Sequence, residues 1–167
     1  PMWSNYGDPM PREEACAALG LDPSLHYTLF FGYIRDYKGL DLLLDAWGEL
    51  MNQGKLENHR LIVAGEYYSG KERYAEQIAR LGIGDKLVMM DRYIADREAQ
   101  LFSAVDLVVQ PYRHATQSGV TQVAYWFDVP MVVTDVGGLR EIVSDGEVGY
   151  VTEPDPKAIA TAIDRFY

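Results

Sequence analysis

Hydrophobic and polar positions follow one another along the chain in blocks that predict strands and helices in turn. Short, continuous apolar runs, as in buried strands, occupy residues 27–31, 61–64, 87–90, 107–109 and 131–133, with a shorter run at 150–151. Helical patterns cover residues 12–19, 40–51, 74–81, 101–105, 120–127 and 159–166. A glycine or proline follows most of these segments and marks its end. The pattern therefore predicts that strands alternate with helices throughout the chain.

This alternation is typical of a parallel sheet that helices cover on both faces. We expect an α/β, Rossmann-like, doubly wound sheet of about six strands in the order 3-2-1-4-5-6. In that order the winding reverses between strands one and four. The loops after these strands, residues 32–38 and 111–119, should face each other at the carboxyl edge of the sheet, where such folds bind ligands.

The chain of 167 residues is long enough for one domain with a sizeable core. Residues 1–11 contain three prolines and no periodicity, so they are predicted to form a linker that leads into a single domain over residues 12–167. The one cysteine, Cys16, lies among alanines and is interpreted as a small buried hydrophobic residue. His26 and His59 precede the first two strands, at the opposite edge from the loops, and are predicted to be structural.

The formal net charge of −10 argues against a nucleic acid or an anionic membrane as the partner of this segment. No apolar run reaches the length of a membrane span, and no secretory signal is visible. The single cysteine fits a reducing compartment, so a cytoplasmic location is expected. The acidity by itself requires no function beyond solubility.

The positions of the few cations in this acidic chain say more about a candidate site than the net charge does. Arg35 and Lys38, in the loop after the first strand, are the only lysine or arginine residues between Arg12 and Lys55. Arginine suits bidentate phosphate binding and lysine a point-charge contact, but both could instead be solvated, or Lys38 could pair with Asp36 or Asp41. Other predicted strand-end loops also carry cations, at Arg92, Arg113, His114 and Arg140. Cations gathered at one edge favour a pocket for a polyanion such as a diphosphate.

Several polar and small residues beside these cations are candidates for ligand contact. Residues 116–119 place backbone N–H groups at a predicted helix start, where a phosphate can approach closely; a capping role for Thr116 or Ser118 is equally compatible. His114 is a candidate hydrogen-bond donor to a substrate, and Glu141 could accept from a ribose hydroxyl or only complement a helix dipole. No histidine, cysteine and carboxylate grouping has metal-ligand spacing, so no metal and no cofactor are expected.

Two common nucleotide-binding signatures are missing from the sequence. There is no G-x-G-x-x-G after the first strand and no G-x-x-x-x-G-K-[ST] anywhere. Their absence weakens a dinucleotide-dependent dehydrogenase and a P-loop NTPase as interpretations.

A series of short motifs in a fixed order carries a family resemblance. They are FGYIRDYKGL at 31–40, VAGE at 63–66, AVDL at 104–107, VVTDVGGLREIV at 132–143 and DGEVGY at 145–150. Each motif is weak alone, but together they make the chain resemble the C-terminal, donor-binding domain of a GT-B fold glycosyltransferase, of the retaining family 4 (group 1) type. The resemblance covers the chain from about Arg12 onward.

The resemblance implies a nucleotide-diphosphate sugar donor and metal-independent transfer with retention at the anomeric carbon. Arg35 and Lys38 match the family's catalytic cations, which bind the diphosphate and help the nucleotide leave. The segment after the third strand would hold the base, which points to Asp91, Arg92, Tyr93 and Ile94. Donor contacts are also implied for the remaining strand-end candidates: Gly32, His114, Thr116, Gln117, Ser118, Gly119, Gly138 and Glu141.

The sequence departs from the family pattern in one loop. The family usually carries two glutamates, separated by seven residues, around the helix after the fourth strand, and residues 115–124 contain none. Gln117 or Thr116 could replace the contact to the donor sugar, and Gln122 or Glu141 the contact to the ribose. The identity of the sugar is therefore left open.

The resemblance also implies a longer protein. An N-terminal domain would bind the acceptor, a glycan or lipid-linked sugar, and could associate with a membrane. We expect the isolated segment to bind nucleotide weakly and not to transfer sugar by itself. A role in bacterial-type polysaccharide biosynthesis is implied. A nucleotide-sugar epimerase of similar architecture and a degenerate, non-catalytic binding or assembly domain remain as alternatives.

Overall fold

A computed structural model describes residues 6–91, 97–114, 119–136 and 149–167 of the chain. In these residues six strands form one parallel sheet in the order β3-β2-β1-β4-β5-β6. The strands are β1 (His26–Phe31), β2 (His59–Ala64), β3 (Leu87–Met90), β4 (Leu107–Gln110), β5 (Met131–Thr134) and β6 (Gly149–Thr152). The predicted strand order and parallel arrangement are therefore confirmed.

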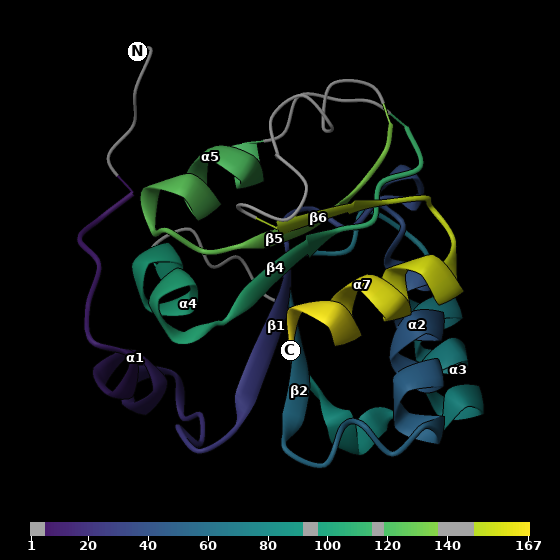
Figure 1. Ribbon diagram of the computed structural model, residues 1–167, viewed down its shortest axis with the longest axis horizontal. Helices are drawn as coiled ribbons and strands as arrows, with labels where there is room; N and C mark the ends of the chain where they lie inside the picture. The colour runs from purple at the N-terminus through teal and green to yellow at the C-terminus, as the bar shows by residue number, and fades with distance from the viewer. Residues whose placement is uncertain (1–5, 92–96, 115–118, 137–148) are drawn as a thin grey trace.

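Helices cover both faces of the sheet (Figure 1). One face carries α1 (Arg12–Leu19), α4 (Glu98–Ala104) and α5 (Gly119–Trp126). The other carries α2 (Leu40–Asn52), α3 (Lys71–Leu81) and α7 (Pro156–Phe166). Two single turns of 3-10 helix, η1 (Asp36–Lys38) and η2 (Gly84–Lys86), precede α2 and β3. The doubly wound α/β architecture expected from the sequence is thus the one observed.

The continuous apolar runs of the strands divide between two hydrophobic cores. In β1, Leu29 joins the core under α1, α4 and α5, whereas the next residue, Phe30, joins the core under α2, α3 and α7. Ile62 and Val63 divide in the same way in β2. Because successive side chains of a strand point to opposite faces, a strand buried on both sides has no polar face. Cys16 is fully buried in the first of these cores, as expected for a small hydrophobic residue.

The amino edge of the sheet contains the two structural histidines. His26 and His59 begin β1 and β2, and their rings stack with centroids 4.9 Å apart. The ring of Tyr167 packs edge-on against His59 at 4.5 Å, and its hydroxyl lies 2.9 Å from the hydroxyl of Thr28. Burial, and then the neighbouring His26, lower the pKa of His59. These contacts agree with the predicted structural role.

The segment before α1 lies against the helices of the first face. Tyr6 packs edge-on against Trp126 at 5.6 Å, and the indole N–H of Trp126 donates to the carbonyl of Gly7 at 2.9 Å. The backbone N–H of Met10 donates to the Ser103 hydroxyl. The boundary at residue 11 between linker and domain stays a prediction. Among helices of the described residues, none is long and apolar enough to span a bilayer.

Candidate functional site

The loop after β1 begins with a close approach between backbones. The N–H of Gly32 donates to the Ala64 carbonyl at 2.9 Å, and that of Ile34 to the Glu66 carbonyl at 2.9 Å. A Cβ added at Gly65 would lie 1.9 Å from the Gly32 carbonyl oxygen, so only glycine fits there. The loops after β1 and β2 therefore run side by side at the carboxyl edge of the sheet.

The loop after β4 contacts the same β1 loop from the other side. A Cβ added at Gly39 would lie 1.9 Å from the carbonyl oxygen of Pro111, and Gly39 has a left-handed φ of 73°. The N–H of Arg113 donates to the Tyr37 carbonyl at 2.6 Å. The loops after strands one and four, expected to face each other from the predicted topology, are thus in direct contact.

Arg35 projects from the β1 loop into an aromatic environment. Its side chain is exposed, and its guanidinium carbon lies 4.2 Å from the ring centroid of Tyr68 and 5.7 Å from that of Tyr33. Among the described residues, no carboxylate forms an ion pair with it. Arg35 therefore keeps an unbalanced positive charge within this part of the chain.

Lys38 carries the second cation of the loop, and it is half-buried. Its ammonium nitrogen lies 6.0 Å from the ring centroid of Tyr112 and 3.4 Å from the position that a Cβ on Gly32 would take. Burial first, and then the charge of Arg35, lower the pKa of Lys38. A partly desolvated ammonium beside a second cation is unfavourable by itself. The attraction of an anion bound beside Lys38 would offset that penalty.

Arg113 has a different environment from the one expected of a phosphate-binding cation. It lies at this edge, as predicted, but one terminal nitrogen donates to Asp41 Oδ1 at 2.7 Å, and the other to Asp41 Oδ2. It also donates to the carbonyl of Asp36 at 3.1 Å. This bidentate pair balances the charge of Arg113, which fastens the β4 loop to the turn that carries Lys38.

The carboxylates that were alternative partners for Lys38 have other partners. Asp41 binds Arg113, and Asp36 accepts a hydrogen bond from Arg73 of α3. Burial opposes ionisation of Asp41, but the hydrogen bonds and charge of Arg113, with backbone donors, outweigh it and lower the pKa of this carboxyl. A pairing of Lys38 with Asp36 or Asp41 is therefore not what the structure shows.

The start of α5 lies close to Gly32 and, through it, to Lys38. Val120 Cγ2 lies 3.8 Å from the position of a Cβ added at Gly32. Gly119, the first residue of the helix, is exposed, and a Cβ added there would meet no neighbouring heavy atom of the described residues within 4 Å. His114 is also exposed. The helix start thus opens on the side of the sheet edge that carries Lys38.

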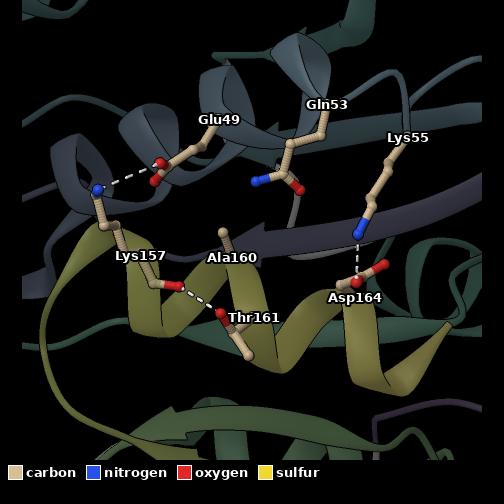
Figure 2. Close-up of a pocket in the computed structure, with 7 residues that line it drawn as sticks. All are labelled: Glu49, Gln53, Lys55, Lys157, Ala160, Thr161 and Asp164. Atoms are coloured by element: carbon tan, nitrogen blue, oxygen red, sulfur yellow. Dashed lines mark hydrogen bonds and ion pairs between the residues drawn. The ribbon is translucent and has the colours of Figure 1, made fainter.

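A hollow between α2 and α7 provides a contrast (Figure 2). Its cations are paired: Lys55 lies 2.6 Å from Asp164, and Lys157 lies 4.0 Å from Glu49. The charges of this hollow balance across the helix interface, whereas Arg35 and Lys38 have no such partner among the described residues. The carboxyl edge is therefore the better candidate for an anion site.

A family model described as "Glycosyl transferases group 1" matches residues 26–167. The chain belongs to this family. The mannosyltransferase LpsB of lipopolysaccharide core biosynthesis from Rhizobium meliloti is 30% identical over 168 residues, which cover 96% of this chain and 47% of that protein. A D-inositol 3-phosphate glycosyltransferase of Segniliparus rotundus is 35% identical over 150 residues, 87% of this chain and 32% of that protein. The chain thus spans less than half the length of these relatives.

Solved structures of group 1 and related glycosyltransferases share the fold. The C-terminal domain of the group 1 protein LpcC from Francisella tularensis superposes with a TM-score of 0.81 at 21% identity, over 94% of this chain and 83% of that one. HepE from Anabaena, solved in complex with UDP, gives 0.79 at 23% identity, over 96% and 44% of the two chains. The similarity confirms that this group 1 chain has the Rossmann-like fold of such glycosyltransferase domains.

The group 1 domain also has a buried polar layer that the sequence patterns missed. Gln110, 1% exposed at the end of β4, accepts from the Thr121 hydroxyl at 3.0 Å and donates to the Tyr112 hydroxyl at 3.3 Å. The Thr134 hydroxyl donates to the Tyr112 carbonyl at 2.6 Å. These bonds fix α5 and β5 to the β4 loop. The available signal was a glutamine directly before Pro111 at the end of an apolar run.

The aromatic residues around the cations were also missed, because Tyr33, Tyr68 and Tyr112 follow no helical or strand period. Other predicted contacts of this group 1 domain lie outside the described residues. They are Arg92, Tyr93, Ile94, Thr116, Gln117, Ser118, Gly138 and Glu141, together with Arg140. Their roles stay predictions.

Proposed function

We propose that this chain binds the diphosphate of a nucleotide-sugar donor, and that Arg35 and Lys38 are the cations that contact it. The observation that carries the proposal is their arrangement in one loop, without a carboxylate partner among the described residues, in a chain of net charge −10. Two such cations are expected to attract a multiply charged anion. Family membership supports this choice, and so do relatives named as glycosyltransferases and the UDP complex of HepE.

The proposed reaction is metal-independent hexosyl transfer with retention at the anomeric carbon. Negative charge would build on the departing diphosphate, and positioned cations stabilise such a charge without rearrangement. Arg35 would supply paired N–H donors, and Lys38 a point charge. Among the described residues, no three histidine, cysteine or carboxylate side chains gather as a metal site would require. In the proposed site, compensation of this charge falls to the two cations.

The full reaction requires more chain than this. The relatives extend over more than twice the matched length, and the proposed acceptor, a glycan or lipid-linked sugar, would lie on a separate N-terminal domain. The 167-residue segment alone would bind nucleotide weakly and would not transfer sugar. Turnover by the isolated segment with any donor and acceptor would refute that part of the proposal.

Nucleotide titration tests the binding proposal. Isothermal titration with UDP, GDP and ADP should show binding of at least one nucleotide, unaffected by EDTA. Arg35→Ala should weaken it by about 1.5–3 kcal/mol, the range for hydrogen bonds to charged groups. Arg80→Ala is the matched control, because Arg80 lies on α3, 3.9 Å from Asp45, and should leave affinity unchanged. Absence of binding would favour a degenerate domain. An unchanged affinity of Arg35→Ala, or a loss no larger than that of Arg80→Ala, would remove Arg35 from the site.

A further inference from the structure

The three described arginines at the β1 loop differ in what they contact. Arg73 and Arg113 donate their N–H groups to the carboxylates of Asp36 and Asp41. Arg73 also lies over the ring of Tyr74, at 5.0 Å. Arg35 lies over the ring of Tyr68, at 4.2 Å, with Tyr33 at 5.7 Å, but no carboxylate of the described residues forms an ion pair with it. The N–H groups of a guanidinium point outward in its plane, whereas an aromatic ring attracts the cation through the ring face. Carboxylate pairing therefore occupies the donors of an arginine, and an aromatic contact does not.

The backbone fixes Tyr68 beside Arg35. The N–H of Tyr68 donates to the Ile34 carbonyl at 3.0 Å, and the N–H of Ile34 donates to the Glu66 carbonyl at 2.9 Å. Ile34 and Tyr67 form an isolated parallel bridge. The rings of Tyr33 and Tyr68 pack edge-on at 6.2 Å, although both side chains are largely exposed, at 48% and 61%. Two exposed tyrosines thus hold a defined arrangement around one cation.

We propose that Tyr68, supported by Tyr33, is a positioning residue that holds the Arg35 guanidinium by its face and leaves its N–H groups free for a diphosphate. The chain has 25 acidic and 15 basic residues, so a mobile arginine has many competing partners. The aromatic contact keeps Arg35 directed at the sheet edge instead. This inference rests on the proposed function, because the free donors matter only if a phosphate binds there.

The test combines variants at Tyr68 with a variant at Arg35. Tyr68→Leu removes the ring and should weaken UDP, GDP or ADP binding about 2- to 5-fold, the range of an exposed cation–π contact. Tyr68→Phe keeps the ring and should bind as the unsubstituted chain does. In an Arg35→Ala background, Tyr68→Leu should have no further effect. A merely structural role would instead weaken binding equally in both backgrounds.

A matched control and a nucleotide-free measurement complete the test. Tyr150 contacts Arg165 in the same way, at 4.6 Å, on β6 and the end of α7, and Tyr150→Leu should leave the affinity unchanged. In the NMR spectrum of the free chain, the side-chain signals of Arg35 should show a ring-current shift that Tyr68→Leu abolishes and Tyr68→Phe retains.

The possible failures can be distinguished. If the chain binds a nucleoside diphosphate and Tyr68→Leu binds equally well, or if the Arg35 signals show no ring-current shift, the positioning role is wrong and the proposed function stands. If the unsubstituted chain binds none of the three nucleoside diphosphates, the proposed function fails, and the positioning role fails with it.

Discussion

The Asp41–Arg113 pair should contribute measurably to stability, and Asp41→Asn tests this. Hydrogen bonds that involve charged groups contribute about 1.5–3 kcal/mol, and this pair is bidentate, with one contact at 2.7 Å. The two side chains are 36% and 35% exposed, so solvent screens them partly. We therefore expect Asp41→Asn to lower the free energy of unfolding by about 1 kcal/mol, less than the range given for hydrogen bonds to charged groups, because solvent weakens this pair.

Asp36, in η1 just before α2, provides a matched control. Asp36 pairs with Arg73 through a single contact between side chains that are 73% and 59% exposed. Surface pairs of this kind contribute about 0–1 kcal/mol, so Asp36→Asn should change stability by less than Asp41→Asn. Urea unfolding followed by circular dichroism measures both values.

A double-mutant cycle isolates the pairwise interaction. Asp41→Asn combined with Arg113→Gln should show a coupling energy of about 1 kcal/mol, because the residues are in direct contact. The folded-state pKa of Asp41 is lowered, so the contribution is present above the unfolded pKa of about 4 and is lost as pH falls through the folded pKa. A coupling energy no larger than that of Asp36 and Arg73, or one that persists in strong acid, would refute the reasoning.

Three further predictions concern the same loop. Gly39→Ala should destabilise the chain by about 2–4 kcal/mol in urea unfolding, because it adds a clash with Pro111 to a left-handed backbone. Gly82 has a similar φ of 68° but open space around an added Cβ, so Gly82→Ala should lower the free energy of unfolding by only about 1 kcal/mol. Equal losses in the two variants would contradict the close approach of Gly39 to Pro111. Lys38→Met should raise the melting temperature while weakening diphosphate binding, because the lowered pKa of Lys38 reflects an unfavourable buried charge; a lower melting temperature would contradict this. A bound diphosphate should raise the pKa of Lys38 again, because it favours the charged ammonium. The affinity measured by titration should therefore begin to fall at a pH below 10.5, the ordinary lysine pKa, as Lys38 of the free chain loses its proton. Lys38→Arg should remove this loss of affinity at alkaline pH.

The order of the strands and the edge that carries the site followed from local patterns. Apolar runs such as residues 61–64 are long enough for a strand buried on both faces, and Gly20 and Gly82 mark the helix ends that the structure shows. Handedness and packing rules then leave few ways to connect alternating strands and helices. These rules alone predict that the loops of Arg35 and Arg113 lie at one edge of the sheet.

Only the tertiary structure decided which of those cations pairs with a carboxylate of the described residues. In the sequence, Arg35 and Arg113 are equivalent: each is an arginine in a strand-end loop. The difference comes from Asp41, which is 72 positions from Arg113 and accepts from both of its terminal nitrogens, and from Tyr68, whose ring lies over Arg35. Hydrophobic periodicity depends on neighbours along the chain, but the partner of a charge depends on distances of a few ångströms between remote segments. The sequence thus determined the fold and the edge of the candidate site, and the folded chain determined which of its cations pair with carboxylates among the described residues.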